Sequence, residues 1–167
     1  MKIKAITIST TNGGIGWNDK LPWFSISIVD KNFNESAKDN VVLIGRSAFE
    51  NHTNLRGLVN YVYTTKDDIQ ETDTIKRASG SAQDIIERIK SENPDKDIII
   101  AGGETVYRTF YDLIDEWKVT IIDEFVPYNK DINLTNIQYI WNNKVLLNSG
   151  IDNNLQFRTY LYSKKNA

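Results

Sequence analysis

The 167-residue sequence contains no cysteine and only one histidine, His52. The absence of thiols excludes disulfides, thiolate nucleophiles and zinc–thiolate sites. A single imidazole also argues against a histidine metal cluster or a histidine-based catalytic triad. We therefore expect no metal site, and any chemistry must come from other side chains or from an organic cofactor.

The sequence also lacks an excess of basic charge and any long apolar run. Its 20 basic and 22 acidic residues give a net charge of −2, so no basic surplus is available to neutralise nucleic-acid phosphates. No stretch approaches the roughly 18 apolar residues of a membrane span, and the opening MKIKAITIST has no signal-peptide core. We expect a cytoplasmic protein without nucleic-acid or membrane partners. The length and the 40% hydrophobic content predict a single globular domain, residues 1–167.

The most informative stretch is DIIIAGGETVYRTF, residues 97–110. Its apolar run Ile98–Ala101 predicts a strand buried on both faces of a parallel sheet. Gly102 and Gly103 follow, and Glu104 opens a helical segment. Such a junction suits a phosphate because backbone N–H groups converge there. An isolated Gly-Gly pair more often marks an ordinary strand-to-helix turn, so the neighbouring motifs must decide between the two interpretations.

A second strand–glycine–helix junction repeats this pattern. The strand Val41–Ile44 ends at Gly45, and Arg46 adds a guanidinium fork suited to phosphate. The next predicted strand, Val59–Thr64, runs into Thr65 and Lys66, which add a hydroxyl and a cation at the strand's carboxyl end.

A glycine-rich loop, Asn12–Lys20, precedes Leu21-Pro22-Trp23. Residues that tolerate positive φ favour a mobile lid over a site, with Trp23 as an aromatic wall. A surface hairpin with a packed tryptophan is the alternative. The remaining pattern predicts an α/β sheet that ends in an antiparallel pair. The other predicted elements are strands at 3–9, 74–78 and 117–122, helices at 25–36 and 81–90, and terminal strands at 138–148 and 155–162.

Read together, four segments make the chain resemble the dihydrofolate reductase family. They are GIGWNDKLPW at 14–23, VVLIGRSAFE at 41–50, IIIAGGETVY at 98–107 and WKVTIIDE at 117–124, with Asp131 beyond them. The resemblance implies an α/β, dihydrofolate-reductase-like fold: a mostly parallel eight-stranded sheet with flanking helices and a C-terminal antiparallel hairpin. It also implies NADPH-dependent reduction of dihydrofolate, or of a related pteridine, by hydride transfer.

The resemblance further implies an NADPH site. Arg46 is expected near the 2′-phosphate, and Gly102–Gly103, joined by a cis peptide bond, beside the pyrophosphate and nicotinamide. The expected cofactor residues are Ile15, Gly16, Gly45, Arg46, Ser47, Thr64, Thr65, Lys66, Ala101, Gly102, Gly103, Glu104, Thr105, Val106 and Tyr107.

Substrate residues follow from the same resemblance. Ile8, Val29, Phe33 and Leu55 are expected to bind the substrate. The catalytic candidates are Asp30, Trp23 and Thr120, and Thr120 is expected to help orient the acidic group. The family's acidic residue falls on Val29, which cannot accept hydrogen bonds from a pterin. Asp30 is the next residue, and a local shift of the helix would present it instead.

A second departure concerns the arginine that binds the glutamate tail of folate in the family. Its slot holds Leu58, and Arg56 lies two residues earlier. Three interpretations therefore stay open. The chain is a working dihydrofolate reductase, a related NADPH-dependent pteridine or pyrimidine reductase, or a non-catalytic member with a binding or structural role. Under each of these interpretations we expect the protein to be a monomer.

Overall fold

The computed structural model describes residues 1–16, 27–124, 130–132, 137–138 and 140–164. Trp23 lies outside the described residues. Val29 and Asp30 lie within a described helix, but their side chains are outside the description.

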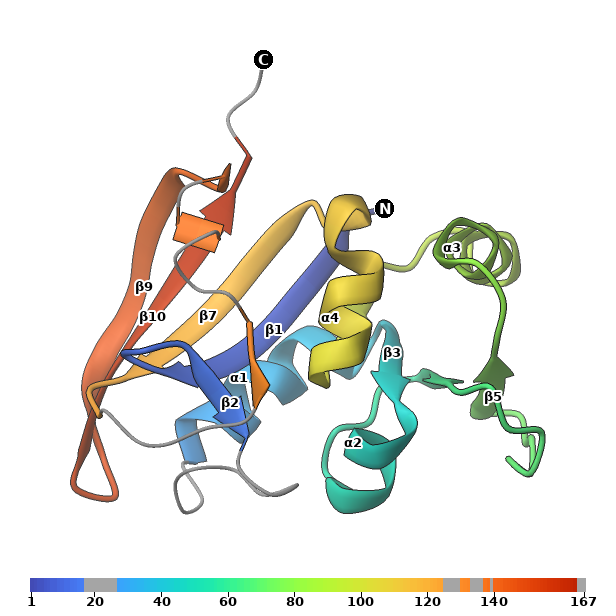
Figure 1. Ribbon diagram of the computed structural model, residues 1–167, viewed down its shortest axis with the longest axis horizontal. Helices are drawn as coiled ribbons and strands as arrows, with labels where there is room; N and C mark the ends of the chain where they lie inside the picture. Colours follow the sequence, from blue (N-terminus) through green and yellow to red (C-terminus); the bar gives the residue numbers. More distant parts are fainter. Residues whose placement is uncertain (17–26, 125–129, 133–136, 139, 165–167) are drawn as a thin grey trace.

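An eight-stranded sheet in the order β5-β4-β3-β6-β1-β7-β10-β9 forms the centre of the fold (Figure 1). Six neighbouring strands, from β5 to β7, are mutually parallel, and β10 pairs antiparallel with both β7 and β9. This arrangement confirms the predicted mostly parallel sheet and its C-terminal antiparallel hairpin. The strands are β1 Ile3–Thr10, β3 Val41–Gly45, β4 Val59–Tyr63, β5 Ile75–Ala78, β6 Ile98–Ile100, β7 Glu116–Ile122, β9 Asn143–Asp152 and β10 Leu155–Ser163.

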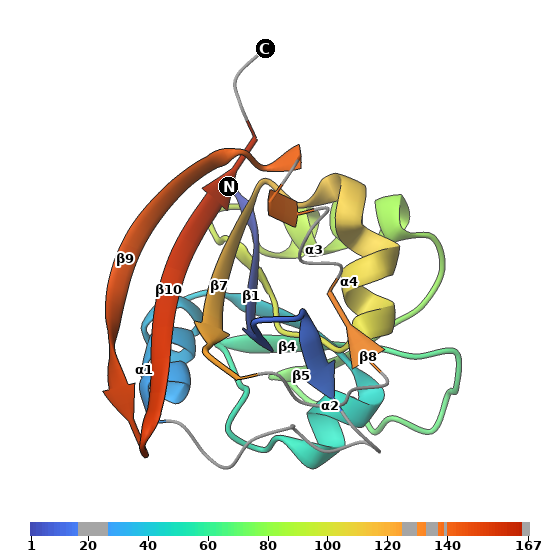
Figure 2. The ribbon, with the colours of Figure 1, turned by 60° about the vertical axis from the view of Figure 1, so that its left-hand side comes forward.

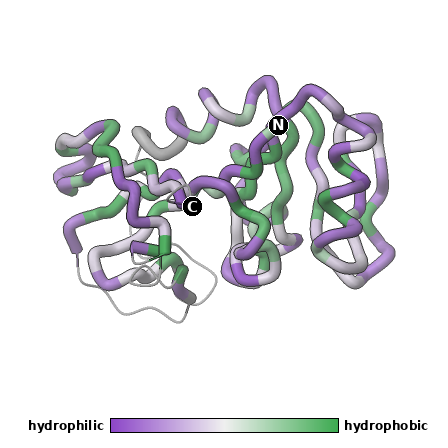
Figure 3. The backbone as a smooth tube through the Cα atoms, turned by 90° about the horizontal axis from the view of Figure 1, so that it is seen from above, coloured by the Kyte–Doolittle hydropathy of each residue, from purple (hydrophilic) through white to green (hydrophobic). Residues whose placement is uncertain are grey.

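Helices cover both faces of the sheet, because its inner strands alternate apolar side chains between the two faces. Val42 and Ile44 pack on one face against Phe33 of α1 (Ser27–Ala37), with α2 (Arg46–Asn51) beside it. Leu43 packs on the other face with side chains of α3 (Ala82–Glu92) and α4 (Glu104–Phe110). Figure 2 shows α1 on one side of the sheet and α3 and α4 on the other, and the apolar stretches follow the inner strands in Figure 3. A short 3₁₀ turn, η1 (Tyr111–Leu113), follows α4.

Two features differ from the sequence-based expectation. The first terminal strand does not cover 138–148: β9 runs Asn143–Asp152, and residues 137, 138 and 140 are helical. The hairpin turn explains the shift, since Asn153 and Asn154 have φ of 51° and 63°, a left-handed pair that asparagine tolerates and that fits a two-residue hairpin loop. In addition, β2 (Gly14–Gly16) and β8 (Lys130–Asp131) form a small antiparallel sheet. β2 lies inside the loop expected at 12–20, and β8 lies in a stretch for which no strand was predicted.

No helix in the described part of the chain is both long enough and apolar enough to cross a membrane.

Candidate active site

The site begins where β3 and β6 end side by side. The Gly45 N–H donates a hydrogen bond to the Gly102 carbonyl oxygen at 2.7 Å, and the Gly102–Gly103 peptide bond is cis, as expected. A Cβ on Gly45 would lie 3.1 Å from Val106 Cγ2. Gly102 has a φ of +105°, and a Cβ there would lie 3.2 Å from the Tyr107 hydroxyl. A Cβ at either position would crowd a neighbouring side chain, and the positive φ of Gly102 is itself unfavourable for any residue with a Cβ.

Gly103 differs from these two glycines. Among the described residues, no heavy atom lies within 4 Å of a Cβ placed on it. The described part of the chain therefore leaves open space beside Gly103, where a bound molecule could approach the backbone.

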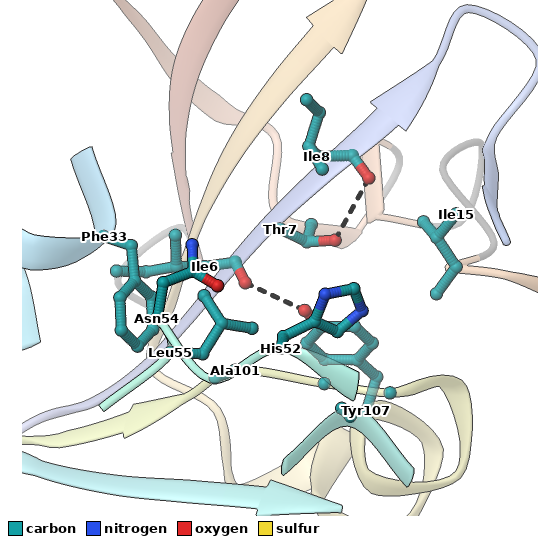
Figure 4. Close-up of a pocket in the computed structure, with 13 residues that line it drawn as sticks. Ile6, Thr7, Ile8, Ile15, Phe33, His52, Asn54, Leu55, Ala101 and Tyr107 are labelled. Carbon is teal, nitrogen blue, oxygen red and sulfur yellow. Dashed lines mark hydrogen bonds between the residues drawn. The ribbon is translucent and has the colours of Figure 1, made fainter. Parts of the chain in front are cut away.

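A cavity of about 160 Å³ adjoins this junction (Figure 4). It brings together side chains that were predicted for different ligands. Ile8, Phe33 and Leu55 come from the predicted substrate set, and they line the cavity. The lining residues from the predicted cofactor set are Ile15, Ala101, Gly102, Gly103 and Tyr107.

Strand β1 and elements on the α1 face of the sheet build much of the cavity wall, and Tyr107 reaches it from α4 on the other face. Ile8 extends from β1, Phe33 from α1, and Leu55 from the loop after α2 (Figure 4). Phe33 is only 2% exposed and packs with Leu55 in the α1-side core, so its ring is a rigid apolar wall. Aromatic and aliphatic walls of this kind suit a flat heteroaromatic ligand.

Tyr107 ties α4 to β1. Its hydroxyl donates a hydrogen bond to the Ile6 carbonyl oxygen at 2.8 Å (Figure 4). Burial raises the pKa of the Tyr107 phenol well above its usual value, so the group stays neutral across the physiological range. The hydroxyl is thus occupied within the protein, and the ring and the position of α4 are what Tyr107 offers to the cavity.

Five further lining residues were not predicted, and they are Ile6, Thr7, Ala48, His52 and Asn54. A signal existed for Ile6, because it shares a strand face with Ile8 at a spacing of two. No comparable signal existed for the loop residues His52 and Asn54, which add an imidazole and an amide to a mostly apolar wall (Figure 4). None of the described lining side chains is a carboxylate. The acid predicted at Asp30 therefore remains a prediction.

Thr120 does not line the described cavity but lies next to it in the sheet. It is in register with Ile8, and registered strand partners share a face of the sheet. Its hydroxyl lies 2.9 Å from the hydroxyl of Thr159, and both residues are buried. The predicted role of Thr120 in orienting an acid from α1 requires this same face.

A second group of predicted residues forms a polar corner beyond the carboxyl ends of β3 and β4. Gly45 is in register with Tyr63, so the segment Thr64–Lys66 emerges beside Arg46. Arg46 Nε donates to Glu50 Oε1 at 2.8 Å, and its two Nη atoms bind the Asp68 carboxylate. The Thr64 hydroxyl accepts a hydrogen bond from the Lys66 N–H at 3.1 Å. The corner thus combines cations and hydroxyls with two carboxylates that the sequence did not indicate.

The remaining predicted cofactor residues make contacts within the fold. Glu104 Oε2 accepts a hydrogen bond from the Asp131 N–H at 2.7 Å, which joins α4 to β8. Val106 is buried in the core, whereas Thr105 is exposed. Ser47 is also exposed, and its hydroxyl accepts a hydrogen bond from the side-chain amide of Asn51. Gly16 is part of β2. Within the described ranges, no group of three or more histidine, aspartate or glutamate side chains is arranged to hold a metal ion.

Arg56 does not take the place of the missing tail arginine. Its Nη1 donates to the carbonyl oxygens of His52 and Leu55 at 3.0 and 3.1 Å, and its Nη2 donates to that of Phe49 at 2.8 Å. The guanidinium also stacks 3.8 Å above the Phe49 ring. Leu58, in the slot of the family's arginine, is 47% exposed and does not line the cavity.

Comparison with known proteins decides the family. A family model described as dihydrofolate reductase matches residues 2–164. The chain belongs to the dihydrofolate reductase family. Two curated proteins named dihydrofolate reductase are similar to it. The protein from Ureaplasma parvum serovar 3 is 26% identical over 127 residues, which cover 74% of this chain and 76% of the relative. The protein from Lactococcus lactis subsp. lactis is 27% identical over 114 residues, which cover 67% of this chain and 66% of the relative.

Membership of the dihydrofolate reductase family assigns the chain to the oxidoreductases of tetrahydrofolate and one-carbon metabolism. Because these relatives are only 26% and 27% identical to the chain, family membership is compatible with the departures from the family's pattern at Val29 and Leu58.

Proposed function

We propose that this protein catalyses the NADPH-dependent reduction of 7,8-dihydrofolate to tetrahydrofolate. The observation that carries the proposal is the shared cavity: the predicted substrate side chains Ile8, Phe33 and Leu55 line the same space as Gly102 and Gly103. Hydride transfer requires the two reacting rings in direct contact, and a shared cavity meets that requirement. Both similar proteins are named dihydrofolate reductase, which supports the proposal.

The residues present fit an NADPH molecule. The open space beside Gly103 allows close approach of a pyrophosphate, and the Arg46 guanidinium is a fork of the kind that binds phosphate. Thr64, Thr65 and Lys66 would hold the adenosine side, and Ile15 and Ala101 the nicotinamide side. When bound, NADPH supplies the hydride, and the protein supplies binding, orientation and electrostatics.

The chain's own residues would do three things. The apolar walls at Ile8, Phe33 and Leu55 would orient the pterin ring and exclude water from it. The Asp30 carboxylate would accept hydrogen bonds from the pterin N3 and 2-amino group and support protonation at N5, with Thr120 orienting the carboxylate. Trp23 would cover the reacting rings. The active form would be a cytoplasmic monomer.

The absence of an acid at Val29 and of an arginine at Leu58 favours one competing proposal. In that proposal the protein keeps the fold and binds NADPH but catalyses no reduction. Binding and turnover measurements separate the two.

The experiment that tests the site as a whole measures binding of NADPH and of methotrexate, an analogue of dihydrofolate, by quenching of tryptophan fluorescence. The proposal predicts that each ligand binds and that NADPH tightens the binding of methotrexate, because the two share the cavity. Methotrexate binding that is absent or unaffected by NADPH would overturn the assignment of the substrate site.

A further inference from the structure

The cation expected to meet the 2′-phosphate of NADPH is already bound by carboxylates of the chain itself. Arg46 Nη2 lies 3.1 Å from Asp68 Oδ2, and Arg46 Nη1 binds the other oxygen of the same carboxylate. Arg46 Nε donates to Glu50 Oε1 at 2.8 Å. The two-point contact with Asp68 uses the edge of the guanidinium that binds planar anions.

The fold explains why Asp68 reaches this position. The β3–β4 register sets Gly45 opposite Tyr63, so the residues that follow each strand emerge together. Arg46 opens α2 on one side, and the exposed segment carrying Asp68 leaves β4 on the other. Asp68 therefore occupies the Nη1–Nη2 edge of Arg46, the edge that would bind a phosphate by two hydrogen bonds.

A carboxylate at this place acts differently on the two nicotinamide dinucleotides. A 2′-phosphate must displace Asp68 from Arg46 and then remain near its negative charge. The free 2′-hydroxyl of NADH is a hydrogen-bond donor, and a carboxylate accepts from such a ribose hydroxyl in NAD-binding sites. The hydrogen bond from Arg46 holds the pKa of Asp68 below its usual value, so the negative charge is present throughout the neutral range.

Other cations keep the corner able to bind a phosphate. Lys66 adds an exposed ammonium group, and Arg77 donates from Nη2 to the Thr65 carbonyl oxygen at 3.1 Å. The negative charge of Asp68 therefore reduces the positive charge of this corner without neutralising it. The expected result is a weakened preference for the phosphorylated cofactor.

We propose that Asp68 is a specificity-determining residue that narrows the preference of this protein for NADPH over NADH by competing with the 2′-phosphate for Arg46. The inference rests on the proposed function, in that it requires a nicotinamide dinucleotide to lie with its adenosine side against Arg46.

The test measures dissociation constants of NADPH and NADH by titration calorimetry for the parent, Asp68→Asn and Asp67→Asn. Asp67 is the matched control, since it is the adjacent exposed acid and Arg46 binds Asp68 instead. Asp68→Asn should raise the ratio of the NADH dissociation constant to the NADPH dissociation constant about two- to fivefold, in keeping with the strength of a surface ion pair. Asp67→Asn should change that ratio less than about twofold, and higher salt should shrink the effect of Asp68→Asn.

Asp68→Ala is a second variant that removes the carboxylate without leaving an amide to bind Arg46, and it should change the ratio in the same direction. An unchanged ratio in both Asp68 variants, or an equal gain for both cofactors, would overturn the inference and leave the proposed function standing. Failure of the parent to bind either dinucleotide would overturn both.

Discussion

The N–H of Gly45 and the carbonyl oxygen of Gly102 form a 2.7 Å hydrogen bond that joins the ends of two neighbouring strands, β3 and β6. These residues are 57 positions apart in the sequence, and their contact places both glycine junctions at one edge of the sheet. Gly103, the next residue after Gly102, lies at the same edge of the sheet, and among the described residues the space beside it is open.

Alanine substitutions of the adjacent residues Gly102 and Gly103 should have different effects. Gly102→Ala should lower the free energy of unfolding by about 1–2 kcal/mol, because its φ of +105° is unfavourable for a residue with a Cβ. Gly103→Ala should change stability by less than about 1 kcal/mol but weaken NADPH binding, since the added methyl occupies the open space. Urea unfolding and NADPH titration of both variants check this. Parent-like NADPH affinity in Gly103→Ala would show that the cofactor does not approach this residue.

The hydroxyl pair Thr120–Thr159 offers a matched test of the proposed role of Thr120. Replacing either residue by valine leaves the other buried hydroxyl without its partner, so each variant should lose about 1–3 kcal/mol of stability. Only Thr120→Val should also slow hydride transfer, by roughly tenfold or more, because only Thr120 is expected to orient the acid. Single-turnover rates of the two variants provide the comparison. Equal rates would reduce Thr120 to a structural residue.

Restoring the family's arginine should improve recognition of the glutamate tail. Leu58→Arg should lower the KM for dihydrofolate several-fold through a charge-assisted contact and leave the KM for a pteridine without a glutamate tail unchanged. Leu58→Gln, which is polar but uncharged, is the control. If Leu58→Arg changes the KM for both substrates alike, or for neither, position 58 does not face the tail.

The raised pKa values of two tyrosines, Tyr61 and Tyr107, predict that the protein loses stability at alkaline pH. Burial and the hydrogen bond to Glu92 raise the pKa of Tyr61 to about 12, and burial raises the pKa of Tyr107 further. In the unfolded chain both phenols ionise near pH 10, so the folded state retains the protons longer. The free energy of unfolding should therefore be unaffected by these groups below about pH 10 and fall as the pH rises above it. Tyr107→Phe should flatten this fall in urea unfolding measured at several pH values. A slope equal to that of the parent would contradict the assignment.

Much of the fold was predictable because local patterns agree with the tertiary arrangement. The all-apolar runs Val41–Ile44 and Ile98–Ala101 are typical of inner parallel strands, and they occupy that position. The limits of β9 were not predictable from hydrophobicity, since its residues are mostly exposed and carry no clear alternation. The Asn153–Asn154 turn sets them instead.

The candidate site was predictable to the extent that it lies at strand ends. Gly45 and Gly102 follow apolar runs, and parallel neighbours end at the same edge. His52 and Asn54 were missed because their place depends on how the loop after α2 folds over β1, a tertiary property. The Arg46–Asp68 ion pair was missed for the same reason, since it depends on the β3–β4 register.

The most direct test of the proposed function is dihydrofolate-dependent oxidation of NADPH by the purified protein and by Asp30→Asn. The proposed function predicts that the parent oxidises NADPH only when dihydrofolate is present and that methotrexate stops the reaction. It also predicts that Asp30→Asn lowers the rate by orders of magnitude with little change in NADPH affinity. Equal rates in the two proteins would remove Asp30 from the mechanism. A parent protein that binds NADPH and oxidises none of it with dihydrofolate would contradict the proposed reductase activity and favour the non-catalytic interpretation.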